Sequence, residues 1–95
     1  MIKQIVDFLN KYFNNERIFV DFWAPWCGSC KMLSNVLETI EDVKIGKVNV
    51  DENENVAKKY DILNLPTCIL FQDGKEINRF SGYKNKEQIE QFITM

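Results

Sequence analysis

Apolar residues recur along the chain with two alternating spacings, and these predict its helices and strands. Residues 2–14 carry apolar side chains three and four positions apart, which predicts an amphipathic helix. Residues 17–23 are β-formers without a polar alternate face, as in a central strand covered on both sides. Helical spacing returns from Cys27 to about Glu41, and alternation from Val43 to Val50 predicts a second strand. Strand, helix and strand in this order predict a parallel βαβ unit with a right-handed crossover.

The second half of the chain predicts a ββα unit. After an acidic segment, residues 56–60 form a short helical pattern. Residues 68–72 and 75–80 read as strands, and Asp73-Gly74 between them is a strong hairpin sequence. Asn85 and Gln88 have capping-box spacing at the start of a last helix. The apolar face of that helix consists of Ile89, Phe92 and Ile93.

Size, charge and the absence of long apolar runs narrow the class of protein. The chain has 95 residues, 45% of them hydrophobic, which fits one globular domain spanning residues 1–95. Its net charge is −2 with basic residues spread out, so we expect no nucleic-acid partner. No segment has the length of a signal-peptide core or a membrane span. We therefore expect a cytoplasmic monomer with no membrane partner.

The main candidate for chemistry is the Trp26-Cys27-Gly28-Ser29-Cys30 segment, where the first strand gives way to a helix. Cysteines three positions apart at the first turn of a helix can form a small disulfide ring. Unpaired N–H groups and the helix dipole there favour a thiolate at Cys27, so the spacing predicts a redox couple. The alternative is half of a zinc or iron–sulfur site. Histidine is absent and only Cys68 is left over, so four ligands would need carboxylates or a dimer.

Several motifs in a fixed order resemble the thioredoxin family from Phe19 onward. They are Val20-Asp21-Phe22-Trp23-Ala24, Trp26-Cys27-Gly28-Ser29-Cys30-Lys31, Lys47-Val48-Asn49-Val50-Asp51, Leu65-Pro66-Thr67, Phe71-x-x-Gly74 and Gly82. The resemblance implies an α/β thioredoxin fold with helices on both faces of a mixed sheet. We expect four strands, or five if Met1–Ile5 pair as a short N-terminal strand.

The resemblance also implies a function, that of a protein disulfide reductase. Cys27 would be the exposed nucleophile and Cys30 the buried resolving thiol. No cofactor would be bound, and electrons would come from a separate thioredoxin reductase, commonly a flavoprotein using NADPH. Clients implied by the resemblance are ribonucleotide reductase, peroxiredoxins and methionine sulfoxide reductases. Alternatives are a glutaredoxin-like protein driven by glutathione, or a scaffold that binds a partner without turnover.

Further site residues follow from matching positions in the family. Asp21 would assist proton transfer at Cys30, with a pKa raised by burial, and Lys47 matches the neighbouring lysine. The alternatives are a strand-end aspartate facing water and a merely solvated lysine. Pro66 matches a cis-proline beside the sulfurs. A shallow groove for an extended client chain would be formed by Trp26, Val50, Asn64, Leu65, Pro66, Gly82 and Tyr83. Gly28 and Ser29, between the cysteines, would also contact the client.

The residues between the cysteines and the additional Cys68 are among the departures from the expected pattern. Gly28-Ser29 replaces the usual Gly-Pro between the cysteines. Serine restores a backbone N–H and brings a hydroxyl near the Cys27 sulfur, so we predict a less reducing potential. Cys68 begins a buried strand, where it is expected to act as a small hydrophobic residue. The alternatives for Cys68 are a regulatory disulfide or dimerisation.

Overall fold

The computed structural model describes residues 17–94. The helix predicted over residues 2–14 and the optional fifth strand at Met1–Ile5 lie outside the described residues. The described elements are β1 (Arg17–Trp23), α2 (Gly28–Leu37), β2 (Lys44–Asn49), α3 (Glu54–Lys59), β3 (Thr67–Gln72), β4 (Lys75–Ser81) and α4 (Lys86–Ile93).

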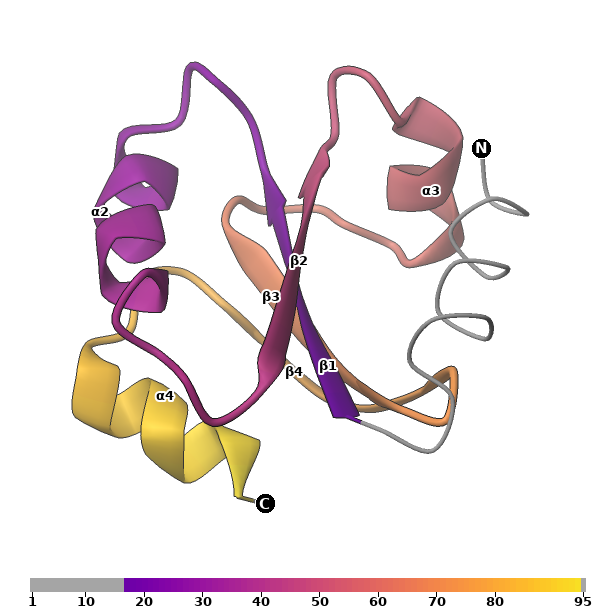
Figure 1. The fold of residues 1–95 in the computed structure, drawn as a ribbon. Coiled ribbons are helices and arrows are strands. Elements are labelled where there is room, and N and C mark those ends of the chain that lie inside the picture. The colour runs from indigo at the N-terminus through magenta and orange to yellow at the C-terminus, as the bar shows by residue number, and fades with distance from the viewer. Residues whose placement is uncertain (1–16, 95) are drawn as a thin grey trace.

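The strands form one mixed sheet in the order β2-β1-β3-β4 (Figure 1). β1 pairs with β2 in parallel and with β3 antiparallel, and β3 pairs with β4 antiparallel. The βαβ and ββα units predicted from the sequence are therefore joined through β1 and β3. The described part of the chain confirms the four-stranded mixed sheet.

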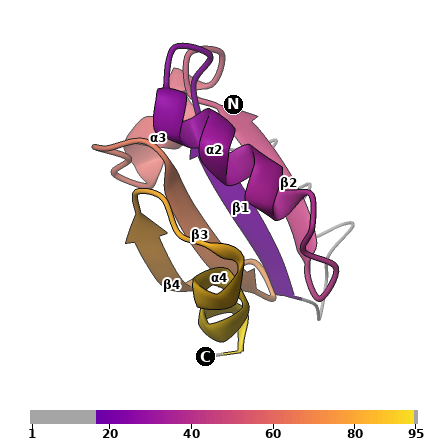
Figure 2. The same ribbon diagram turned by 90° about the vertical axis from the view of Figure 1, so that its left-hand side faces the viewer.

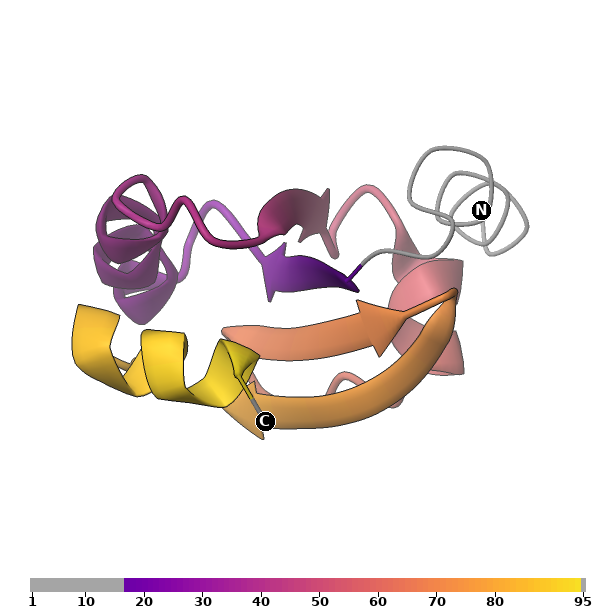
Figure 3. The same cartoon turned by 60° about the horizontal axis from the view of Figure 1, so that its bottom comes forward.

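Helices cover both faces of this sheet, and β1 lies between the two cores. Figures 2 and 3 show α2 and α4 on one face, whereas α3 lies on the other. Phe19 belongs to a buried cluster with Leu33 of α2 and Ile89 of α4. Phe22 belongs to a second cluster that includes Val56 of α3. Because alternate side chains of a strand point to opposite faces, both faces of β1 must be apolar, as its sequence predicted.

Two helix boundaries differ from those predicted. α2 ends at Leu37 rather than near Glu41, and its last turn continues into a tight turn. The amide of Ile40 donates to the carbonyl of Leu37 at 3.1 Å, and this turn places Ile40 in the core. Ile40 therefore reaches the core although the helix has already ended. α3 begins two residues before the predicted start and spans Glu54–Lys59.

Among residues 17–94, no helix combines the length and apolar character needed to cross a membrane.

The two local turn and cap predictions are confirmed. Asp73 and Gly74 both have positive φ, 54° and 80°, as a two-residue hairpin turn of this kind requires. The amide of Gln88 donates to Asn85 Oδ1 at 2.9 Å, and the amide of Asn85 donates to Gln88 Oε1 at 3.0 Å. This reciprocal pair is the capping box that starts α4.

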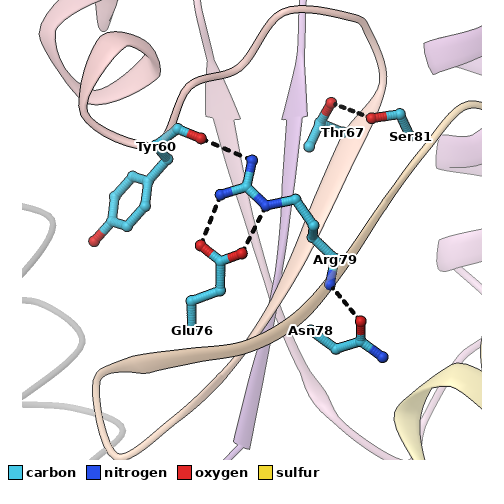
Figure 4. Close-up of polar contacts among 6 residues, drawn as sticks. All are labelled: Tyr60, Thr67, Glu76, Asn78, Arg79 and Ser81. Carbon is cyan, nitrogen blue, oxygen red and sulfur yellow. Dashed lines mark hydrogen bonds and ion pairs between the residues drawn. The ribbon is translucent and has the colours of Figure 1, made fainter.

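Polar contacts connect β4 to β3 and to the segment that precedes β3 (Figure 4). Arg79 Nη1 donates to the carbonyl of Tyr60 at 2.8 Å, while its Nε donates to Glu76 at 2.6 Å. The hydroxyls of Thr67 and Ser81 lie 3.0 Å apart across the β3–β4 pair. The Arg79 contact holds the start of the segment before β3 against β4.

Candidate active site at the start of helix α2

Cys27 and Cys30 form a disulfide at the N-terminus of α2, with their Cα atoms 5.3 Å apart. Cys27 is the N-cap residue, in an extended backbone conformation, and its Sγ accepts the Cys30 amide at 3.2 Å. The Ser29 hydroxyl oxygen lies 3.5 Å from the same sulfur. Cys27 Sγ therefore sits where N–H donors and the helix dipole stabilise negative charge.

The expected difference in exposure between the two cysteines is small in this disulfide state. Cys27 is 6% exposed and Cys30 is 2% exposed. The prediction that Cys27 is exposed is therefore wrong for the oxidised form. As the helix cap, its sulfur lies against the first turn instead of projecting outward. Trp26 beside it is 70% exposed, as its place at a loop tip predicted, and its Nε1 donates to Asp51 Oδ2 at 3.1 Å.

Asp21 is a buried carboxylate in the middle of the sheet. It is fully buried in β1, so the alternative of a strand-end aspartate facing water is wrong. Burial raises its pKa from 3.8 to about 6, and the charge of Lys47 and a hydrogen bond from Cys68 partly oppose that rise. Its register partners are Lys47 in β2 and Cys68 in β3. The predicted burial and raised pKa of Asp21 are confirmed.

Asp21, Lys47 and Cys30 meet in one small cleft of about 140 Å³. Lys47 Nζ donates to the hydroxyl of Ser34, so the lysine is exposed but also tied to α2. Ser34 was not identified from the sequence. It follows Cys30 by four positions on the same helix face, which is the signal that would have found it. The cleft is lined by Asp21, Trp23, Ala24, Pro25, Cys30, Lys31, Ser34 and Lys47.

A second, open groove of about 370 Å³ is lined in part by Trp26. Three of the residues expected in a client groove line it, namely Trp26, Val50 and Leu65. Leu63, which the sequence analysis missed, also lines it and is 86% exposed. An apolar pair, Ile62-Leu63, within a connecting segment was the available signal. The remaining lining residues are Glu54, Ala57, Lys58 and Ile62.

Four residues expected in that groove do not line it. The Leu65–Pro66 peptide bond is cis as expected, but Pro66 is buried. The carbonyl of Pro66 accepts a hydrogen bond from the Gly82 amide at 2.8 Å, which ties this segment to the end of β4. Gly82 has a φ of 90°, which favours glycine there. Asn64 and Tyr83 are exposed outside the groove lining.

A helix-capping cysteine, joined to a second cysteine one turn later and near a buried carboxylate, defines a thiol–disulfide oxidoreductase. Within residues 17–94, no group of three or more histidine, cysteine or acidic side chains is placed to hold a metal ion.

The comparisons with known proteins give the family. The thioredoxin family model matches residues 3–95. Thioredoxin from Chlamydia caviae is 43% identical over 88 residues, which are 88% of this chain and 86% of that protein. Thioredoxin from Bacillus subtilis is 40% identical over 81 residues, 80% of this chain and 78% of that protein. The structure of Fasciola hepatica thioredoxin superposes with a TM-score of 0.86 at 36% identity, covering 97% of this chain and 90% of that one. The chain belongs to the thioredoxin family.

Proposed function

We propose that this chain is a cytoplasmic protein disulfide reductase that works by dithiol–disulfide exchange. The observation that carries the proposal is the contact between Cys27 Sγ and the Cys30 amide at the start of α2. In the reduced protein, that donor and the helix dipole favour the Cys27 thiolate, the nucleophilic form of the side chain. A single domain over residues 1–95, acting as a monomer, is part of this proposal.

The first step is attack on the client. The Cys27 thiolate forms a bond to one sulfur of a client disulfide, whose S–S bond breaks. The client's other sulfur leaves with the electron pair of that bond and takes up a proton. The product is a mixed disulfide between Cys27 and the client.

The second step releases the client. Cys30 gives its thiol proton to Asp21, and the resulting Cys30 thiolate attacks Cys27 Sγ. The mixed disulfide breaks, the client sulfur leaves as a thiolate and is protonated, and the Cys27–Cys30 disulfide forms. The client has gained two electrons and two protons. Burial places the pKa of Asp21 at about 6, close enough to neutral pH for a proton acceptor, and its place in the cleft with Cys30 supports this role.

The open groove lined by Trp26, Val50 and Leu65 is the proposed site for the part of the client chain that lies beside the client disulfide. Trp26, Leu63 and Leu65 offer apolar surface, and Val50 contributes to the lining. In this proposal the buried Pro66 positions Leu65 in the groove, and the Gly82 amide fixes Pro66 through its hydrogen bond to the Pro66 carbonyl. In this proposal the remaining expected contact residues lie at the edges of the client chain: Gly28, Ser29, Asn64 and Tyr83.

We propose that a separate thioredoxin reductase returns the disulfide to the dithiol, with no cofactor bound to this chain. Ribonucleotide reductase, peroxiredoxins and methionine sulfoxide reductases are the proposed clients. A reducing compartment such as the cytoplasm would keep the dithiol available.

The test is insulin-disulfide reduction with two alternative electron sources. We expect turnover with NADPH and thioredoxin reductase, and little with glutathione alone. Faster turnover with glutathione would favour the glutaredoxin-like alternative. Cys30→Ser should accumulate a mixed disulfide with insulin, whereas Cys27→Ser should form none. If Cys27→Ser traps insulin and Cys30→Ser does not, the assignment of the two sulfurs is wrong.

A further inference from the structure

Cys68 is a buried thiol that the mechanism above does not use. It is 0% exposed in β3 and is the free cysteine of the described residues. Its Sγ lies 3.8 Å from Asp21 Oδ1, the only oxygen of that carboxylate with a recorded partner, since Asp21 Oδ2 has none in residues 17–94. The two residues are register partners across the β1–β3 pair, so the backbone fixes this contact.

The direction of the hydrogen bond follows from the chemistry of the two groups. An ionised carboxylate can only accept, so the thiol must donate its proton. Burial and the neighbouring Asp21 raise the pKa of the Cys68 thiol far above its usual range, so it stays protonated. A sulfur with no exposed surface is also poorly placed for a regulatory disulfide or a dimer.

We propose that Cys68 is a positioning residue for proton transfer: its thiol holds Asp21 Oδ1 and leaves Oδ2 to exchange the proton with Cys30. This inference rests on the proposed function, in which Asp21 is the proton acceptor. A donor hydrogen bond to the charged form of a carboxyl favours ionisation, so Cys68 offsets part of the burial of Asp21. It thereby keeps Asp21 ionised near neutral pH, where an acceptor is needed.

The other groups facing Asp21 act differently. Lys47 from β2 acts through its charge, while its ammonium donates to the Ser34 hydroxyl of α2. Cys30 and Lys31 of α2 line the same cleft. The residues of α4 that pack in the same buried cluster as Cys68 are apolar, namely Ile89, Phe92 and Ile93. In the oxidised protein, where Cys30 has no thiol proton, the Cys68 thiol is therefore the neutral donor in this group.

The test measures the pKa of Asp21 in the oxidised protein, where neither Cys27 nor Cys30 titrates. The carboxyl ¹³C shift of Asp21 would be followed against pH by NMR in wild type and in Cys68→Val, Cys68→Ala and Cys68→Ser. Valine and alanine remove the donor, one with added and one with reduced volume, whereas serine keeps a donor. Ile69→Val is the matched packing control, because Ile69 is buried in the cluster on the opposite face.

We expect the pKa of Asp21 to rise by roughly half a unit to one unit in Cys68→Val and Cys68→Ala. It should stay near the wild-type value in Cys68→Ser and Ile69→Val. The low-pH limb of the pH profile for mixed-disulfide resolution, which reports ionisation of the proton acceptor, should shift to higher pH in the same two variants. An unchanged pKa in both apolar variants would overturn the proposal, as would a serine variant that shifts as far as they do. This titration needs no turnover, so its failure is distinct from a failure of wild type to reduce insulin.

Discussion

The buried carboxyl of Asp21 predicts an unusual stability effect for Asp21→Asn, which removes the charge and keeps the shape. Burial raises the pKa of Asp21 from 3.8 to about 6 in the folded protein. At about 1.36 kcal/mol for each pH unit, ionising Asp21 costs the folded state about 3 kcal/mol at pH values above 6. Burying the asparagine amide without a full set of partners costs about 1 kcal/mol in return. We therefore expect a net gain of about 2 kcal/mol in the free energy of unfolding at about pH 8.

The sign of the pH dependence follows from the raised pKa. Between 3.8 and about 6, the folded protein binds the Asp21 proton more tightly than the unfolded chain does, so this group lowers stability as the pH rises through that window. The advantage of Asp21→Asn should therefore be fully present above pH 6 and lost as the pH falls towards 4.

Urea unfolding of the oxidised protein at about pH 8 and about pH 4.5 provides the assay. Asp42→Asn is the control, because Asp42 is exposed and its carboxylate keeps its hydration. An advantage for Asp21→Asn that is equal at the two pH values would refute the reasoning, since it would not come from ionisation.

Three further predictions concern the active site, the groove and α4. Ser29→Pro removes the hydroxyl near Cys27 Sγ and should make the redox potential more negative by about 30 mV, measured against glutathione; an unchanged or less negative value would contradict the role of Ser29. Leu63→Ser should raise the KM for insulin several-fold with little change in kcat, and equal kinetics would show that the groove does not bind this client. Asn85→Ala should lower the free energy of unfolding by about 1 kcal/mol, whereas Asn55→Ala, outside any capping contact recorded for the described residues, should not.

Local sequence rules predicted most of the fold. The Asp73-Gly74 turn and the Asn85–Gln88 capping box each depend on residues within four positions of one another, so local chemistry determines them. β1 was predicted as a central strand because its side chains must be apolar towards both helical layers. The end of α2 was missed because Ile40 reaches the core through a tight turn, which apolar spacing alone does not distinguish from another turn of helix.

The parts of the site that were missed depend on contacts between distant segments. Cys68 and Asp21 are 47 positions apart and meet only because β1 and β3 pair in one particular register. The contact between Ser34 and Lys47 likewise needs α2 to lie over β2. The burial of Cys27 could not be read from its loop position, because it results from the sulfur turning back onto its own helix.

The position of the Cys27 sulfur against its own helix affects two properties of the protein in opposite directions, its reactivity and its reducing power. Whatever stabilises a negatively charged sulfur at this helix end makes Cys27 react faster at neutral pH, but it also lowers the free energy of the dithiol relative to the disulfide. A protein whose dithiol is more stable is a weaker reductant. The single amide of Cys30 thus contributes both to how quickly this chain attacks a client and to which clients it has the driving force to reduce.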